Sequence, residues 1–505
     1  MRTVFSVSGN QVLSLYEAFA TAGLRIVHMR HESAAAYAAA GLAEVTGEMG
    51  IVLVAGGPGF LASLVGVAVS ASLELPLLLI SGGPPANGDR PGAFQYVDQA
   101  RIASAVCKQT SRIARVDEIE ECVVNAMATA LDGVPGPVHV MVPVDIALAA
   151  PDEIATILAN ASMYVTQTPV PDEGGLRRIA DGLATAKRPL VIARPSAARG
   201  AAGETLRELC RRLGAKPAIM ESPRGSEDLK YRAVMSRYAD ADYALLVGPA
   251  DFSVGFLSGE FVAKGGRAAL IDAPGDPQAA RDVDVHVRAN AASALAALVK
   301  MLPDAARTPW TGAATPLERI DTGNALHPLR VGELLAAALE PSDLIVLDGG
   351  EFGQWMRAAL ATVTNRVIWN SRMGAIGGSV PLALGAALAQ PERRVIVAVG
   401  DGAFGYHGTE IETAVREGAR LTILIGNDDR WGAEWHTQRE KYGRAVATML
   451  GTVSYDEVAR GFGALGYEVS DEGDLQRSLA LALAADETVA LNVRIASVRS
   501  PATAP

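Results

Sequence analysis

The chain has 505 residues, of which 49% are apolar and 20% are charged, and its formal net charge is −11. This length is too great for one hydrophobic core and predicts about two to four domains of ordinary globular composition. The acidic balance argues against a nucleic-acid partner, and no uninterrupted apolar run reaches the roughly 18 residues that a membrane-spanning helix needs.

The cysteines and the first residues bear on the cellular location. Cys107, Cys122 and Cys210 are odd in number and lack metal-ligand spacing, which favours a reducing compartment. The opening stretch, MRTVFSVSGNQ, has too short an apolar run for a secretory signal. We therefore expect a soluble, cytoplasmic protein.

Apolar runs typical of strands buried on both faces alternate with helical segments along the chain. The predicted strands are 50–55, 76–81, 189–194, 243–248, 268–272, 344–350, 395–400 and 421–426. Helical segments between them include SAAAYAAAGLAEVTG and GETLRELCRRLGA. This alternation predicts an α/β protein with parallel sheets that are covered by helices.

Two stretches, about 150–172 and about 303–328, mix Pro, Thr and Gly without a helical or alternating period, as linkers do. They divide the chain into three Rossmann-like α/β domains, which we place at 1–165, 173–305 and 325–505. In the middle domain, VGPADFSVGF and LIDAPGD carry no GxGxxG fingerprint.

The first candidate functional residue is Glu32, at the start of the alanine-rich helical segment and directly after the short predicted strand RIVHM. A glutamate in the first turn of a helix is commonly stabilised there by the helix dipole, so a structural role is one interpretation. A catalytic role is the other, and this segment alone leaves both open.

A second candidate site lies where two neighbouring predicted strands, 395–400 and 421–426, end. Asp401 follows the first strand, and Asn427 and Asp428 follow the second. Two surface turns are the simpler explanation, because Asp, Asn and Gly are common turn residues. However, ligands of open α/β sheets bind beyond the carboxyl ends of the strands, which is where these carboxylates fall.

The same segment has the features of an anion site. Gly400 and Gly402 allow backbone amides to approach an anion, and a helix predicted to begin near Ala403 adds its positive end. Carboxylates beside a phosphate need a cation between them, and Mg²⁺ bridges carboxylate and phosphate oxygens. The expected metal ligands are Asp401, Asp428 and a main-chain carbonyl at Arg430.

The arrangement from Gly400 to Asp428, with 24 residues between Gly402 and Asn427, resembles the diphosphate-binding motif of thiamine-diphosphate enzymes. That motif begins GDG and ends in paired asparagines, the second of which is replaced here by Asp428. The order HE, alanine-rich helix, GIVLVAGGPG and ELPLLLISGG is similar to the pyrimidine-binding domain of the acetolactate synthase-like superfamily. In the C-terminal part, RMGAIGGSVPLALGAAL extends the resemblance, which covers nearly the whole chain.

The resemblance implies a pyrimidine-binding first domain and a diphosphate-binding third domain, both with the thiamine-diphosphate-binding fold. It implies that Glu32 is the catalytic glutamate at the cofactor's pyrimidine, and that Gln95 contacts the substrate oxygen unless it is only a loop glutamine. The implied cofactor contacts are Pro58, Gly350, Glu351, Gly374, Ile376, Asp401, Gly402, Ala403, Asp428, Trp431 and Gly432. Further substrate contacts would be Gln11, His31, His407 and Trp431.

Several stretches, among them VFSVSGNQV and NDDRWGAEWHTQ, look closest to benzaldehyde lyase and somewhat less to 2-hydroxyacyl-CoA and oxalyl-CoA enzymes. This implies a carbon–carbon lyase or carboligase that makes or cleaves 2-hydroxy ketones through an enamine on thiamine diphosphate. Gln11 stands where benzaldehyde lyase has a histidine, and a neutral amide orients a carbonyl but does not shuttle protons near pH 7. The substrates would be aldehydes, 2-hydroxy ketones or 2-oxo acids.

Three alternatives stay open: a 2-oxo acid decarboxylase or condensing enzyme of the acetolactate synthase type, a 2-hydroxyacyl-CoA lyase, and a scaffold that binds the cofactor without turnover. The resemblance also implies a homodimer or homotetramer, with each cofactor between Glu32 of one subunit and the diphosphate-binding domain of its partner. The middle domain resembles one that binds FAD or an ADP moiety in some relatives, but we expect it to be ligand-free.

Overall fold

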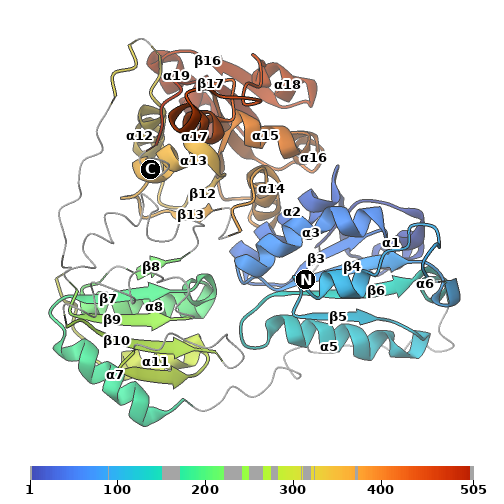
Figure 1. Cartoon of the computed structure of the whole chain (residues 1–505), viewed down its shortest axis with the longest axis horizontal. Coiled ribbons are helices and arrows are strands. Elements are labelled where there is room, and N and C mark those ends of the chain that lie inside the picture. The colour runs from blue at the N-terminus through green and yellow to red at the C-terminus, as the bar shows by residue number, and fades with distance from the viewer. Residues whose placement is uncertain are drawn as a thin grey trace. The chain divides into compact units, whose positions relative to one another are not determined.

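The computed structural model describes residues 3–88, 90–149, 171–215, 217–220, 241–248, 265–273, 283–308, 310, 320–323, 325–369 and 373–500. It holds three parallel β-sheets with helices packed on them (Figure 1), which confirms the predicted fold class. The chain forms two compact units, one of Met1–Ala130, Gly136–Tyr164 and Arg319–Pro505, the other of Leu131–Pro135 and Val165–Glu318. The predicted linkers lie largely (150–172) or partly (303–328) outside the described residues, and our domain boundaries stay predictions.

The first sheet has the strand order β2-β1-β3-β4-β6-β5. Its strands are β1 (Thr3–Ser6), β2 (Arg25–His28), β3 (Gly50–Val54), β4 (Leu77–Gly83), β5 (Gln109–Arg112) and β6 (Pro137–Pro143). The helices that accompany them are α1 (Leu13–Thr21), α2 (Glu32–Thr46), α3 (Pro58–Ser72), α4 (Gln99–Ala103), α5 (Ile119–Leu131) and α6 (Val144–Leu148).

The C-terminal sheet, of strands β12 to β17, repeats this topology. Its order is β13-β12-β14-β15-β17-β16, the same as that of the first sheet when strands are numbered within each sheet. The strands are β12 (Leu344–Leu347), β13 (Arg366–Trp369), β14 (Val395–Gly400), β15 (Leu421–Asn427), β16 (Leu465–Val469) and β17 (Val489–Arg494). The helices are α12 (Pro328–Ala338), α13 (Gly350–Ala359), α14 (Ser379–Ala389), α15 (Asp401–His407), α16 (Glu410–Arg416), α17 (Gly432–Tyr442), α18 (Tyr455–Gly461) and α19 (Glu472–Ala484).

The second unit has a smaller parallel sheet of its own, in the order β11-β10-β9-β7-β8. Its elements are α7 (Glu173–Thr185), β7 (Pro189–Ala193), α8 (Gly200–Leu213), β8 (Pro217–Ile219), β9 (Tyr243–Val247), β10 (Arg267–Asp272), β11 (Val285–Arg288) and α11 (Ala291–Met301). A cavity of about 190 Å³ lies where β7, β9 and β10 end, with Arg194, Gly248 and Asn290 in its lining. The expectation that this domain is ligand-free stays a prediction.

Small residues explain how α2 packs. The helix is buried throughout from Ser33 to Glu44, and it lies between α3 and α14 within the first unit. A methyl group on Gly41 would come within 1.9 Å of the Leu382 carbonyl oxygen, and one on Gly385 within 1.8 Å of the Ala38 carbonyl oxygen. The two helix backbones therefore touch, which fixes α2, with Glu32 in its first turn, against the C-terminal half of the chain.

A buried histidine in the first sheet makes stability depend on pH. His139 has no exposed surface, and its ring nitrogens lie 2.7 Å from Ser81 Oγ and 2.9 Å from Thr110 Oγ1. Burial lowers the pKa of His139 to about 4, so the folded state resists protonation while the unfolded chain binds a proton near pH 6.5. Stability is therefore lost as the pH falls from about 6.5 towards 4, by about 3 kcal/mol from this residue.

We expect the thermal unfolding midpoint of His139→Gln to fall less between pH 7 and pH 5 than that of the wild type. The variant keeps a polar side chain but removes the titrating group. Calorimetric scans at several pH values check this, and parallel curves for the two proteins would contradict the assignment to His139.

Two further expectations concern cysteines and membranes. Cys107, Cys122 and Cys210 are all unpaired in the structure. In the part of the chain that the structure describes, no helix has the length and apolar character to cross a bilayer.

Candidate functional site

The strand order of the C-terminal sheet points to one place for a ligand. From β12 the chain moves outward to β13, whereas β14 and β15 lie on the other side of β12. Ligands of open α/β sheets bind at such a switch point, beyond the carboxyl ends of the strands. The residues there are Gly350 at the start of α13 and Asp401 at the start of α15.

Asp401 is a buried carboxylate with a free oxygen. Its Oδ1 accepts a hydrogen bond from the Gly402 amide at 2.9 Å, and its Oδ2 is buried without a hydrogen-bond partner among the described residues. Burial, and then the charge of Asp428, raise the pKa of Asp401 to about 7. A buried oxygen left without a partner is costly, so this position favours a cation or a donor from a ligand.

Asp428 is the second carboxylate of the site. Its side chain is 13% exposed, and the Arg430 Nε lies 3.8 Å from its Oδ2 while donating to the Asp428 carbonyl oxygen at 2.7 Å. Burial raises the pKa of Asp428 to about 6, with a further contribution from Glu351, although a hydrogen bond from Ser497 and the charge of Arg430 oppose it. Burial thus disfavours the charged form of both Asp401 and Asp428, and a bound cation would offset this effect.

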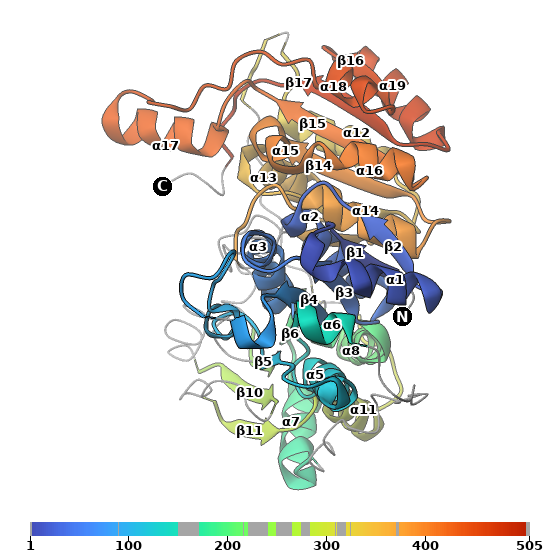
Figure 2. The ribbon, with the colours of Figure 1, turned by 90° about the vertical axis from the view of Figure 1, so that its right-hand side faces the viewer.

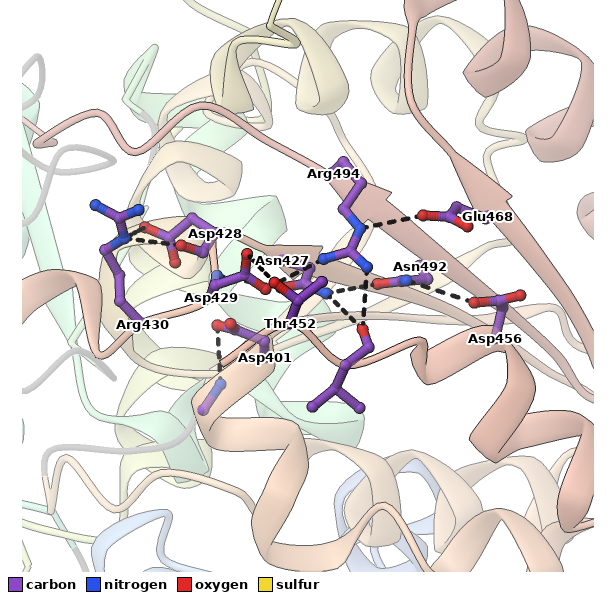
Figure 3. Close-up of polar contacts among 12 residues, drawn as sticks. Asp401, Asn427, Asp428, Asp429, Arg430, Thr452, Asp456, Glu468, Asn492 and Arg494 are labelled. Atoms are coloured by element: carbon purple, nitrogen blue, oxygen red, sulfur yellow. Dashed lines mark hydrogen bonds and ion pairs between the residues drawn. The ribbon is translucent and has the colours of Figure 1, made fainter. Parts of the chain in front are cut away.

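Asn427 has a different role from its neighbour, because it holds the loop instead of facing the site (Figure 3). Its Nδ2 donates to Asn492 Oδ1 at 2.9 Å and to the Val453 carbonyl oxygen at 3.1 Å. Asp429, which has a φ of 58°, is held by Arg494 at 3.1 Å. The network fixes the turn after β15 and leaves Asp428 on the side of Asp401.

Gly400 and Gly402 have different surroundings, and α15, which contains Gly402, starts earlier than predicted. We expected a helix from about Ala403, but α15 begins at Asp401, with Gly400 as its N-cap residue. A methyl group on Gly402 would lie 2.6 Å from the Trp431 ring, whereas one on Gly400 would meet nothing closer than 4.0 Å. Gly402 thus makes room for an aromatic ring, and Gly400 leaves open space.

The turn that carries Gly374 and Ile376 is held by a residue that sequence reasoning missed. Asp348 is fully buried, and its carboxylate accepts hydrogen bonds from the amides of Gly377 at 2.9 Å and Ser379 at 3.0 Å. Ile376 packs partly buried against the core. The strand predicted at 344–350 ends at Leu347 in the structure, and the available signal was the acidic residue that follows it in LDGG.

Three predicted site residues from the N-terminal part of the chain, Gln11, Glu32 and Gln95, lie at the turn between β3 and α3. Gln11 Oε1 accepts from the Gly56 amide at 2.7 Å. A methyl group on Gly57 would touch the Gln95 carbonyl oxygen at 2.5 Å, and one on Gly59 would lie 3.3 Å from Glu32 Oε1. Pro58, another predicted contact, is the first residue of α3 in this turn.

Gln95 has a strained backbone, with a φ of 59°. A left-handed conformation at a residue other than Gly, Asn or Asp is uncommon and costs energy. Such strain is often found at functional sites, which agrees with the proposed role of Gln95.

The predicted substrate histidines have internal partners. His31 is the N-cap residue of α2, and its Nδ1 accepts from the Ser33 amide at 3.1 Å. His407 is buried, with Nδ1 2.6 Å from the Gly377 carbonyl oxygen and Nε2 2.7 Å from Ser33 Oγ. Both ring nitrogens of His407 thus have partners within the chain. Neither nitrogen is free for the substrate contact that we predicted.

The remaining predicted contacts lie around the start of α17, which extends from the C-terminal sheet (Figure 2). Trp431 is the N-cap residue of this helix. Its ring meets the Tyr406 ring edge-on, with 6.3 Å between the ring centroids. Glu351 accepts from the Ser500 amide at 2.7 Å and lies against Gly432, whose added methyl group would be 3.2 Å from Glu351 Cγ. Glu351 and Gly432 therefore flank the Asp428 side chain.

The residues present fit a hard divalent cation with a phosphate. Among the described residues, no three His, Cys, Asp or Glu side chains gather to hold a metal ion. Asp401 and Asp428 supply two carboxylates, and Asp401 stands at the start of a helix whose free N–H groups favour anions. Mg²⁺ is commonly bound by one or two carboxylates together with phosphate oxygens, so this pair needs no third acidic ligand.

Comparison with protein families identifies the two halves of this arrangement. The model of the thiamine pyrophosphate enzyme C-terminal TPP-binding domain matches residues 348–493. The model of the corresponding N-terminal TPP-binding domain matches residues 1–102. Thiamine pyrophosphate is the same molecule as thiamine diphosphate.

Curated relatives match over nearly the whole chain. A probable acetolactate synthase of Mycobacterium bovis is 31% identical over 513 residues, covering 97% of this chain and 92% of the relative. The 2-hydroxyacyl-CoA lyase 2 of Homo sapiens is 27% identical over 534 residues, covering 94% of this chain and 84% of the relative.

A solved structure, benzoylformate decarboxylase from Polynucleobacter necessarius, superposes with a TM-score of 0.83 at 19% identity. It covers 99% of this chain and 97% of its own, and at this identity the likeness establishes the fold. It agrees with the architecture of three parallel α/β sheets. The chain is therefore a member of the thiamine pyrophosphate enzyme family, related to acetolactate synthase and 2-hydroxyacyl-CoA lyase.

Proposed function

We propose that this thiamine-diphosphate enzyme depends on Mg²⁺ and makes or cleaves the carbon–carbon bond of 2-hydroxy ketones. The observation that carries the metal is the pair Asp401 and Asp428, of which Asp401 has a buried, unpartnered oxygen at the start of α15. Mg²⁺ would be held by Asp401, Asp428 and the Arg430 carbonyl, and it would in turn hold the diphosphate.

Two exposed side chains near Asp428 support an apolar carbonyl substrate. They are Tyr406 and Met449. Tyr406 contacts Trp431, and Met449 pairs with Arg430 through its main chain. A substrate with an aryl or alkyl group beside its carbonyl would cover these side chains.

Each predicted catalytic residue has a task that its side chain can perform. When bound, thiamine diphosphate supplies the carbon nucleophile and the sink for the carbanion charge. Glu32 would exchange a proton with the cofactor's pyrimidine nitrogen, and Gln95 would donate a hydrogen bond from its amide to the substrate oxygen without ionising. Ile376, on the turn held by Asp348, would support the shape of the cofactor.

We further propose that two copies of the chain complete each site, in a cytoplasmic homodimer or homotetramer. The Glu32 carboxylate faces Gly59 of α3, whereas Asp401 lies at the opposite end of α15 from His407, which contacts the residue next to Glu32. The resemblance of the sequence to thiamine-diphosphate enzymes supports a site in which Glu32 meets Asp401 and Asp428 of the partner subunit.

A substrate comparison tests the proposed reaction. Protein loaded with thiamine diphosphate and Mg²⁺ is incubated separately with benzoin, pyruvate and a 2-hydroxyacyl-CoA, and the products are separated by chromatography. We expect benzoin to give benzaldehyde, and Glu32→Gln to serve as the inactive control. No cleavage of benzoin under conditions where the cofactor is bound would overturn the proposal.

The second candidate is condensation of 2-oxo acids, as in acetolactate synthase. It is favoured by the 31% identity to a probable acetolactate synthase over 97% of this chain. Formation of acetolactate from pyruvate, without cleavage of benzoin, would place the chain in that class.

A further inference from the structure

Glu32 begins α2, which packs on the first sheet, but the residues on either side of it are held by helices of the C-terminal half of the chain. Glu410, the first residue of α16, is fully buried, and its Oε1 accepts hydrogen bonds from the amides of Arg30 at 3.0 Å and His31 at 3.2 Å. These two residues immediately precede Glu32. They are separated from Glu410 by about 380 residues in sequence, so no local rule brings them together.

The carboxylate of Glu410 is itself fixed. Thr413, one turn further along α16, donates its hydroxyl to Glu410 Oε2 at 2.6 Å. Burial raises the pKa of Glu410, while the bonds from Thr413, Arg30 and His31 lower it. The Glu410 side chain is therefore fully buried, and both of its carboxylate oxygens accept hydrogen bonds from within the protein.

A second contact holds the residue that follows Glu32. Ser33 Oγ lies 2.7 Å from His407 Nε2, at the last residue of α15. The other ring nitrogen of His407 lies 2.6 Å from the Gly377 carbonyl oxygen, in the turn that carries Ile376. Glu32 is thus held on both sides, by Glu410 before it and by His407 after it.

Resting on the catalytic role of Glu32 in the proposed function, we propose that Glu410 is a positioning residue for the Glu32 carboxylate, and that the Ser33–His407 contact assists it. The two amides that Glu410 holds fix the backbone on which Glu32 enters α2. Its carboxylate then points towards α3, where Gly59 leaves it room. Neither Glu410 nor His407 touches the reacting atoms.

The chain offers a matched control in Glu412, two residues further along the same helix. Glu412 Oε2 accepts from Arg30 Nε at 2.9 Å, so it binds the side chain of the residue whose main chain Glu410 holds. This ion pair is partly exposed, with side chains 50% and 24% accessible, and its energetic contribution is small. Glu412→Gln removes a charge next to Arg30 without loosening the backbone before Glu32.

The first measurement is amide hydrogen exchange of the metal-free, cofactor-free protein, which does not depend on the proposed reaction. In Glu410→Ala we expect the amides of Arg30 and His31 to exchange about fivefold faster than in the wild type, because one hydrogen bond to each is lost. Glu410→Gln, which keeps an oxygen acceptor, and Glu412→Gln should stay close to the wild type. Unchanged exchange in Glu410→Ala would overturn the proposal.

The second measurement is a double-mutant cycle on turnover at saturating cofactor. We expect Glu410→Ala to lower kcat by about 10- to 100-fold in the wild-type background, as a misplaced catalytic group does, while the Kd for cofactor with Mg²⁺ changes little. In the Glu32→Gln background the same change should have no effect on the residual kcat. An equal loss in both backgrounds would mean that Glu410 only stabilises the fold.

Ser33→Ala provides an independent test if Glu410→Ala does not fold. It removes the hydroxyl bound to His407, and its loss of kcat should also vanish in the Glu32→Gln background. Full activity of Glu32→Gln itself would refute the catalytic role of Glu32, whereas a catalytic Glu32 with additive losses would refute the positioning role alone.

Discussion

Glu32→Gln is expected to lower kcat by roughly 10²–10⁴-fold while leaving thiamine diphosphate bound. The range is that of a positioned acid or base group, because glutamine keeps the shape of glutamate but cannot hold a transferable proton. The structure supports the effect by placing Glu32 at the first position of α2 with its carboxylate beside the β3–α3 turn. Steady-state kinetics at saturating cofactor, with calorimetric binding in parallel, measure both quantities.

The control is Glu48→Gln, an exposed glutamate just past the end of α2. It removes the same charge from the same part of the chain, and we expect wild-type kcat. If Glu32→Gln kept full turnover, Glu32 would be only a first-turn helix residue, which is the alternative that its sequence context left open.

Asp401→Asn is expected to weaken the metal-dependent binding of thiamine diphosphate by at least 10- to 100-fold, the loss typical even of residues one layer outside a metal. Asp401 contributes the buried oxygen that has no partner within the described chain. An amide leaves one neutral oxygen there and places an N–H group where a cation would lie. Titration of the variant with cofactor at fixed Mg²⁺ measures the change.

Asp428→Asn is the informative comparison, since asparagine is the residue that the family's motif has at this position. It keeps an oxygen ligand and removes the Asp428 charge, which together with burial raises the pKa of Asp401. We expect Asp428→Asn to lower the affinity for the cofactor less than Asp401→Asn does. Equal losses from the two variants would show that the charge of Asp428, and not only its oxygen, is needed.

The sequence was informative about elements whose pattern is local. The apolar run 395–400 is β14 with the same bounds, and the strand predicted at 421–426 is β15 with one further residue, Asn427. Runs of Val, Ile and Leu mark buried parallel strands irrespective of what they pair with. Glu32 was placed correctly at the start of its helix, because a short strand and an alanine-rich segment bracket it.

The start of α15 was predicted two residues late. Glycine lowers helix propensity, so GDG was taken as a turn before the helix instead of its first residues. The structure overrides that preference because the Trp431 ring covers Gly402, and because Gly400 takes the N-cap position. Contacts of this kind depend on a loop about 30 residues further along the chain and are not visible in the local pattern.

The residues that hold the site were missed for a related reason. Glu410 stands among other acidic residues in HGTEIETAV and looks like one face of an exposed helix, yet it is fully buried against Arg30 and His31. Asp348 likewise looks like a turn residue but binds the amides of the turn that carries Ile376. Buried carboxylates that bind distant backbone amides leave no periodic signal in a single sequence.

The most direct test of the account is calorimetric titration of metal-stripped protein with thiamine diphosphate and Mg²⁺ together, then with each omitted in turn. The account predicts saturable cofactor binding that requires the metal, because Asp401 and Asp428 repel a diphosphate unless a cation lies between them. No binding at millimolar cofactor, or equal binding without the metal, would contradict it.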